Sequence, residues 1–195
     1  EAALLVSSGM AAVSTALFGL LRAGDELVSS AAIYGGTMQL IRSFLEKFGV
    51  RVRFEPIEKF ATPSSLLSES TKVLWFETPI NPTLRCVDIA AVAAACRARG
   101  VTTVIDSTFA SPTNQSPLEL GVDLVMHSAT KYLNGHSDIT AGTLVGSAEL
   151  IKTLTPARKL LGCMLDPAAA ALVARGLKTL GVRMERHNAN ALAVA

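Results

Sequence analysis

The sequence contains little of what builds metal centres or disulfide frameworks. Its three cysteines, Cys86, Cys96 and Cys163, have no CxxC spacing and are odd in number, which predicts free, buried thiols in a reducing compartment. The three histidines lie far apart and form no ligand motif. We therefore expect no metal site.

Long apolar runs and an excess of one charge are also missing. The longest apolar stretch, residues 10–21, is interrupted by Ser14, Thr15 and Gly19. It falls short of the roughly 20 residues that a membrane helix needs, so we expect a core helix there. The 18 basic and 16 acidic residues are scattered and give a net charge of +2. This mild balance argues against nucleic acid and against a membrane as partners.

The chain is long enough for one domain with a buried core, since it has 195 residues of which 50% are hydrophobic. It opens at Glu1 without an initiator methionine or a signal peptide, and it closes inside an alanine-rich helical pattern. We interpret residues 1–195 as a single domain cut from a longer protein, so its ends carry no information on targeting.

Strand-like and helix-like segments alternate along the sequence. This alternation predicts an α/β fold of three layers, α/β/α, in which helices cover both faces of a mostly parallel sheet. The predicted strands are residues 26–29, 50–54, 73–76, 101–105, 124–126 and 141–145. The predicted helices are residues 9–23, 34–48, 88–99 and 168–180.

Polar residues cluster where three of these strands end. Asn81 follows one strand, Asp106 and Thr108 follow the next, and residues 128–131 follow a third. In open α/β sheets, ligands bind outside the carboxyl ends of the strands. The sequence therefore predicts a ligand site at one edge of the sheet.

Lys131 and Asp106 indicate which ligand that is. Lys131 follows a buried strand, shortly after the hydroxyl residues Ser128 and Thr130, so we expect a partly desolvated amine that can form a Schiff base with an aldehyde. A lysine Schiff base and an aspartate facing a pyridinium nitrogen are the two protein groups that pyridoxal phosphate (PLP) requires. A salt bridge or a helix cap is the alternative role for Asp106.

Three further positions are candidate cofactor contacts if the ligand is PLP. Gly9 and Met10 begin a helix, where free N–H groups bind phosphate, although a plain N-cap is the alternative. Tyr34, beside two glycines, is either a ring that stacks on a cofactor or a half-buried tyrosine. Asn81 is either a cofactor contact or a turn residue.

The remaining basic and histidine candidates are interpreted as structural. His127 and His136 flank the lysine segment and are expected to have satisfied structural roles. The predicted solvated helix face consists of Arg175, Lys178, Arg183 and Arg186.

Taken together, these residues resemble the Cys/Met-metabolism family of PLP enzymes, the transsulfuration group. The resemblance covers nearly the whole chain, and its segments occur in the family's order. They are residues 8–10 (SGM), 34–37 (YGGT), 77–82 (ETPINP), 104–110 (VIDSTFA), 127–132 (HSATKY) and 175–180 (RGLKTL).

This resemblance implies an aspartate aminotransferase-like large domain of fold type I, with PLP as cofactor and small amino acids as substrates. It implies that Lys131 carries the cofactor and moves protons, with help from Tyr34, which stacks on the ring. Asp106 is expected to keep the ring nitrogen protonated, and Asn81 to contact the ring oxygen and the substrate carboxylate. The other implied cofactor-binding residues are Thr108 at the ring and Gly9, Met10, Ser128 and Thr130 at the phosphate.

Within the family, residues 84–89, 111–115 and 127–131 look most like cystathionine γ-synthases. We therefore predict γ-replacement, in which an activated homoserine ester and cysteine give cystathionine. Cystathionine γ- and β-lyases, methionine γ-lyases and homoserine sulfhydrylases share the same core residues and stay open. Methionine γ-lyases usually have cysteine where this chain has Gly36.

Two parts of the family pattern lie outside this sequence. Family members have an N-terminal arm that reaches the neighbouring subunit's phosphate and a C-terminal domain with a carboxylate-binding arginine. The resemblance implies a homodimer or homotetramer in the cytoplasm, or in a plastid for a plant-type enzyme. The alternatives of another class are a non-catalytic truncated domain and a nucleotide-binding α/β domain, although no GxGxxG or GxxxxGK[ST] motif is present.

Overall fold

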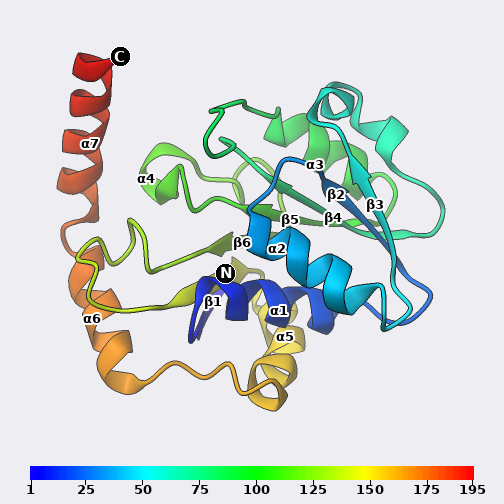
Figure 1. Ribbon diagram of the computed structural model, residues 1–195, viewed down its shortest axis with the longest axis horizontal. Helices are drawn as coiled ribbons and strands as arrows, with labels where there is room; N and C mark the ends of the chain where they lie inside the picture. The colour runs from blue at the N-terminus through cyan, green and yellow to red at the C-terminus, as the bar shows by residue number, and fades with distance from the viewer.

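A computed structural model describes residues 1–195 as one seven-stranded sheet with helices on both faces (Figure 1). The strands lie in the order β1-β7-β6-β5-β4-β2-β3. Their bounds are β1 (Ala2–Val6), β2 (Glu26–Ser30), β3 (Arg51–Glu55), β4 (Thr71–Glu77), β5 (Thr102–Asp106), β6 (Leu124–His127) and β7 (Gly142–Gly146).

The sheet is mostly parallel, as predicted. Strands β3, β2, β4, β5 and β6 pair in parallel, whereas β7 pairs antiparallel with both β6 and β1. Parallel neighbours bring their carboxyl ends to the same edge. The ends of β4, β5 and β6 therefore deliver the polar residues that follow them to one place.

The alternating side chains of the strands build two separate cores. In β4, Val73 and Trp75 belong to one cluster with α1 (Gly9–Leu20), whereas Leu74 and Phe76 belong to the other cluster with α3 (Ile89–Arg97). Helix α5 (Ala148–Leu160) packs on α1. Because successive strand residues point to opposite faces, this division gives the predicted α/β/α layers (Figure 1).

Two further helices pack beside the segment that follows β6. Helix α6 (Pro167–Leu177) and helix α7 (Leu180–Val194) contribute Val173, Leu180 and Met184 to a third cluster, which also contains Ala129 and Leu133. In Figure 1 they form a column at one side of the sheet. The short remaining helices are α2 (Gly35–Leu40), a π turn (Ile41–Leu45), two 3₁₀ turns (Ile57–Ala61 and Pro63–Leu66) and α4 (Ser111–Asn114).

The structure corrects several details of the sequence prediction. Strand β1 and helix α5 were not predicted, and α7 follows α6 after a break at Lys178–Thr179. The single helix expected over residues 34–48 changes from α to π geometry at Ile41 and ends at Leu45. Cys86 is exposed rather than buried, because it lies in the loop between β4 and α3.

Candidate active site

An open pocket of about 1130 Å³ lies at the carboxyl edge of the sheet. Its walls come from the start of α1, the loop before α2, the ends of β4, β5 and β6, and α7. The pocket is lined by all nine residues that the sequence analysis selected: Gly9, Met10, Tyr34, Asn81, Asp106, Thr108, Ser128, Thr130 and Lys131.

One end of the pocket, at the start of α1, has features that suit a small anion. The Ser8 side chain caps α1 by accepting a 2.9 Å hydrogen bond from the Ala11 N–H. The N–H groups of Gly9 and Met10, in the first turn, have no partner within the helix. A Cβ on Gly9 would lie 2.8 Å from Ser128 Oγ, so only glycine lets the segment after β6 approach the helix start this closely.

The two hydroxyls beside Lys131 differ in their availability. Thr130 Oγ1 donates to the Ala141 carbonyl at 3.1 Å and accepts from the Ala141 N–H at 3.0 Å. This pair ties the lysine segment to the residue before β7. Since its proton is already donated, Thr130 has less to offer an anion than we predicted. Ser128 Oγ makes no hydrogen bond within the chain and lies against Gly9.

Asp106 is a buried carboxylate without a cationic partner. It ends β5, is 7% exposed, and accepts a 3.0 Å hydrogen bond from the Thr108 N–H at Oδ1. Burial raises the pKa of this carboxyl, and the hydrogen bonds with Thr108 oppose the rise. A buried charge requires a partner, so Asp106 suits a ligand that presents a cationic N–H.

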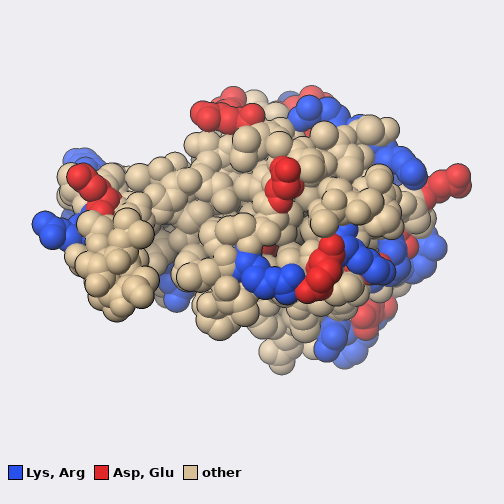
Figure 2. Space-filling view, turned by 90° about the horizontal axis from the view of Figure 1, so that it is seen from above, with Lys and Arg blue, Asp and Glu red and all other residues tan.

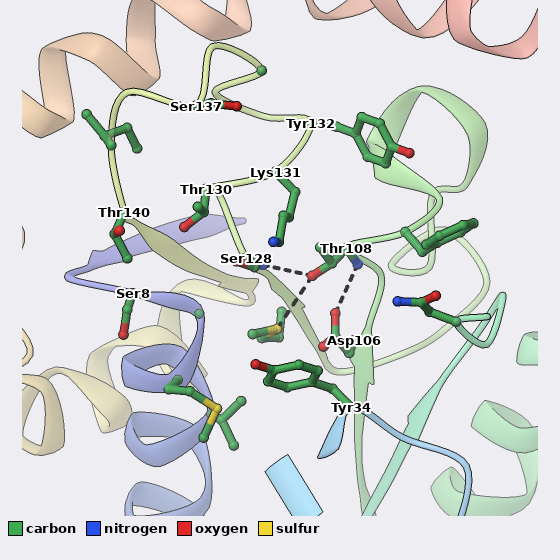
Figure 3. A pocket seen from close by; sticks show the side chains of 18 of the residues that line it. Ser8, Tyr34, Asp106, Thr108, Ser128, Thr130, Lys131, Tyr132, Ser137 and Thr140 are labelled. Atoms are coloured by element: carbon green, nitrogen blue, oxygen red, sulfur yellow. Dashed lines mark hydrogen bonds between the residues drawn. The ribbon is translucent and has the colours of Figure 1, made fainter. Parts of the chain in front are cut away.

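Thr108 joins the two strand ends. Its Oγ1 accepts a 2.8 Å hydrogen bond from the Ser128 N–H and lies 3.9 Å from Met126 Sδ. The segments after β5 and β6 are thereby held together directly above Asp106 (Figure 3). We expect this connection to keep Asp106 and the lysine segment at a fixed separation.

Lys131 and Tyr34 face the same space from opposite sides (Figure 3). Tyr34 is 58% exposed, so its ring is free to cover a planar ligand in the pocket. The side chain of Lys131 is also exposed, so the expected desolvation by burial is wrong. The reason is that Lys131 lies in the turn beyond β6, at the pocket rim, rather than beneath the strand.

The sequence analysis did not assign a role to Glu77, although this residue opens the quoted ETPINP segment. It lies at the end of β4, opposite Asp106 in the β4–β5 register. Burial, with a smaller contribution from the charge of Asp106, raises the pKa of Glu77 to about 7. Adjacency to Asp106 could have been inferred only from the strand register.

Arg183 was predicted on a solvated helix face but lines the pocket. It donates to two carbonyls of the structure and is only partly exposed. Arg175 pairs with Asp138. His187 also lines the pocket and packs edge-on against Tyr132, with ring centroids 5.4 Å apart. No periodic pattern marks these residues, because helix α7 reaches the site through tertiary packing.

No group of three or more His, Cys, Asp and Glu residues is arranged to hold a metal ion. None of the helices has both the length and the apolar character to cross a bilayer. The face seen in Figure 2 shows basic and acidic side chains interspersed, with no broad patch of one sign. His127 is buried in β6, which lowers its pKa to about 4 and leaves it neutral at pH 7.

A lysine, a buried aspartate and a glycine-lined helix start that meet at the carboxyl edge of an α/β sheet define a PLP-binding domain. Sequence comparison gives the family. The profile described as Cys/Met metabolism PLP-dependent enzyme matches residues 1–195, and the chain belongs to this family.

Curated relatives of the chain are lyases. It is 44% identical to L-methionine γ-lyase of Pseudomonas putida over 197 residues, covering 100% of this chain and 50% of that protein. It is 42% identical to cystathionine γ-lyase of Dictyostelium discoideum, and this match covers 98% of the chain and 50% of that protein. It is 40% identical to cystathionine β-lyase of Lactococcus lactis, covering 97% and 50%. The chain thus spans about half the length of these relatives.

Solved structures confirm the fold. Cystathionine γ-lyase from Lactobacillus plantarum, complexed with L-serine, superposes with a TM-score of 0.94 at 38% identity, and the match covers 100% of this chain and 51% of that one. The metB protein of Corynebacterium glutamicum superposes with a TM-score of 0.95 at 38% identity, and the match covers the same shares of the two chains. The curated lyases described above support the lyase alternatives better than the predicted γ-synthase.

Proposed function

We propose that this chain is the cofactor-binding domain of a PLP-dependent lyase that cleaves C–S bonds of sulfur amino acids. The observation that carries the proposal is the arrangement of Lys131 and Asp106 on one pocket, with Asp106 buried and without a cation. The kinship with lyases acting on methionine and cystathionine supports this substrate class.

Asp106 would hold the ring nitrogen of the cofactor. When bound, PLP supplies an electron sink that stabilises negative charge at the substrate's α-carbon. The carboxylate of Asp106 accepts the ring N–H and so keeps that nitrogen protonated. Its burial strengthens this pairing, because little water competes for the charge.

Lys131 would hold the cofactor and then move protons. Its side chain points into the pocket over the space that Asp106 and Tyr34 face. From there the amine can take a proton from the α-carbon and return one at the carbon that loses sulfur. Tyr34 would cover the ring and assist this transfer, and Asn81 would contact the ring oxygen and the substrate carboxylate.

The phosphate would lie at the start of α1. The N–H groups of Gly9 and Met10 and the Ser128 hydroxyl converge there, and the positive end of the helix dipole favours an anion. Thr130 would donate to the phosphate only after its hydroxyl turns away from the Ala141 carbonyl, to which it donates in this structure.

γ-Replacement is the second candidate, because Gly36 argues against one of the eliminating enzymes, the methionine γ-lyases. A Cβ at Gly36 would lie 2.5 Å from Tyr34 Cε1 and 3.1 Å from Met10 Sδ. The Tyr34 ring therefore occupies the space that a cysteine, the residue usual in methionine γ-lyases, would need. This difference argues against a simple methionine γ-lyase and keeps cystathionine chemistry, including γ-replacement, in view.

The first test is borohydride reduction after incubation with PLP, followed by peptide mapping. We expect a pyridoxyl group on Lys131 and none in Lys131→Ala, with the exposed Lys152→Ala as the matched control. Label spread over surface lysines would overturn the proposal and favour a non-catalytic domain. Activity is then measured as α-keto acid release from methionine and from cystathionine, against cystathionine formation from an O-acylhomoserine and cysteine.

Assembly and location belong to the same proposal. From the family we expect a homodimer or homotetramer in the cytoplasm. Light scattering after size-exclusion chromatography measures the oligomeric state. A labelled chain that gives no product would indicate that groups from elsewhere complete the site.

A further inference from the structure

Glu77 lies beside Asp106 at the edge of the sheet. The two residues end adjacent parallel strands and occupy the same register position. Each is only 7% exposed. Neither forms an ion pair with a lysine, arginine or histidine of the chain. Two neighbouring buried carboxylates without a cation are costly, because each charge lacks a partner, and the end of a strand does not require them.

The Glu77 carboxylate connects two loops of the pocket. Its Oε2 accepts a 2.8 Å hydrogen bond from the Tyr34 N–H, and its Oε1 accepts a 3.3 Å hydrogen bond from the Asn81 N–H. The first loop leads into α2 and the second follows β4. One side chain thus sets the positions of the ring-covering tyrosine and of the asparagine opposite.

The charges around Glu77 are few. The element on one side, β5, presents Asp106, and β2 on the other side ends in the uncharged Ser29 and Ser30. His127 on β6 is neutral near pH 7, since its pKa is about 4. The other charged residues that line the pocket are Lys131, Asp138 and Arg183. The remaining titratable side chains there are Tyr34, Tyr132 and His187.

We propose that Glu77 is a positioning residue whose ionisation couples the Tyr34 and Asn81 loops to the arrival of a cationic ring at Asp106. This inference rests on the proposed function, because the ring in question is the protonated pyridine of PLP. Glu77 would act through Asp106 and through the two loops rather than as a ligand of the ring.

The coupling follows from the charges. With Asp106 unpaired, ionisation of Glu77 places two negative charges side by side in a buried site, and this repulsion helps to hold the pKa of Glu77 near 7. A pyridinium N–H at Asp106 offsets the repulsion, so Glu77 loses its proton to solvent. Its hydrogen bonds with the Tyr34 and Asn81 N–H groups then become charge-assisted and stronger. The two loops tighten as the ring binds.

The test uses pyridoxine 5′-phosphate, which has no aldehyde and cannot bond to Lys131. Calorimetry in buffers of different ionisation enthalpy measures affinity and proton release for wild type and Glu77→Gln. We take the case in which the ring lowers the pKa of Glu77 by one unit. At pH 6.5, wild type should then release about half a proton more than the variant on binding. The ratio of wild-type affinity to variant affinity should rise roughly sevenfold between pH 5.5 and 8. Equal proton release and parallel pH curves would overturn the inference.

Two further measurements separate the possible failures. Glu26→Gln, at an equally buried carboxylate in β2 that is 7% exposed, should keep the wild-type proton release. Should Glu77→Gln not fold, amide hydrogen exchange in wild type replaces it, with slower exchange of the Tyr34 and Asn81 N–H groups expected on binding. Unchanged exchange at both amides contradicts the coupling. No binding of the ligand by wild type contradicts the proposed function instead.

Discussion

Arg183 Nη1 donates a 2.8 Å hydrogen bond to the carbonyl oxygen of Tyr132, the residue directly after Lys131. Its other nitrogens donate to the Gly176 carbonyl at 2.8 Å and to Thr179 Oγ1 at 3.1 Å. A single guanidinium therefore joins the end of α6, the start of α7 and the lysine segment. The catalytic lysine proposed here is held from outside the sheet as well as by its own strand.

Replacing Arg183 with methionine should loosen the lysine segment. The change removes three hydrogen bonds and leaves the two carbonyls without this donor, so we expect a loss of about 1–3 kcal/mol in unfolding free energy. Amide exchange should accelerate over residues 131–135. Arg186→Met is the matched control, because no hydrogen bond or ion pair involves Arg186. Equal effects of the two substitutions in urea unfolding would show that the connection is unimportant.

Gly176 and Gly181 form a matched pair for testing the contact between α6 and the lysine segment. A Cβ at Gly176 would lie 2.2 Å from the Asn134 carbonyl oxygen, whereas a Cβ at Gly181 would meet nothing within 4 Å. Gly176→Ala should therefore destabilise the protein by several kcal/mol, since backbone must move. Gly181→Ala should stabilise it by roughly 0.5–1 kcal/mol through helix propensity. Thermal or urea unfolding of both variants measures the difference.

The parallel strands, and the residues that line the pocket, could be predicted from the sequence because both depend on local patterns. Short runs of apolar or alternating residues predict the parallel strands, and the polar residues after three of them fall at one edge. Strand β1 was missed because Ala2–Val6, with two alanines and two leucines, has no strand-like alternation; it is a strand only because β7 pairs with it.

The site residues that could not be predicted from the sequence depend on tertiary contacts. Glu77 acquires its significance from the register that sets it beside Asp106, and Arg183 from the packing of α7 against the lysine segment. Neither relationship has a spacing rule in the chain. The exposure of Lys131 has the same origin, because a strand end does not reveal how far the following turn rises above the sheet.

His127 should make stability depend on pH in mild acid. Burial lowers its pKa to about 4 from the ordinary 6.5, so between these values the unfolded chain binds a proton that the folded chain does not. Stability is then lost as pH falls, by about 2 kcal/mol at pH 5 relative to neutral pH. His127→Gln should remove this part of the pH dependence. Urea unfolding of both proteins at pH 7.5 and 5.0 tests it, and parallel losses would contradict it.

Gly9 offers the sharpest test of the phosphate end of the pocket. In Gly9→Ala the new Cβ would lie 2.8 Å from Ser128 Oγ and 3.3 Å from Ser128 Cα, so the hydroxyl or the helix start must shift. We expect the affinity for pyridoxine 5′-phosphate to fall at least tenfold, because convergence of the α1 N–H groups and this hydroxyl is lost.

Unphosphorylated pyridoxine is the matched ligand for Gly9→Ala. Its ring would still reach Asp106 and Tyr34, so its affinity should change little, and the preference for the phosphorylated ligand should narrow. Ser128→Ala should narrow that preference less, because it removes one donor but leaves the helix start in place. Isothermal titration of both ligands to the three proteins decides the matter. An equal loss for both ligands would place the phosphate somewhere other than the start of α1.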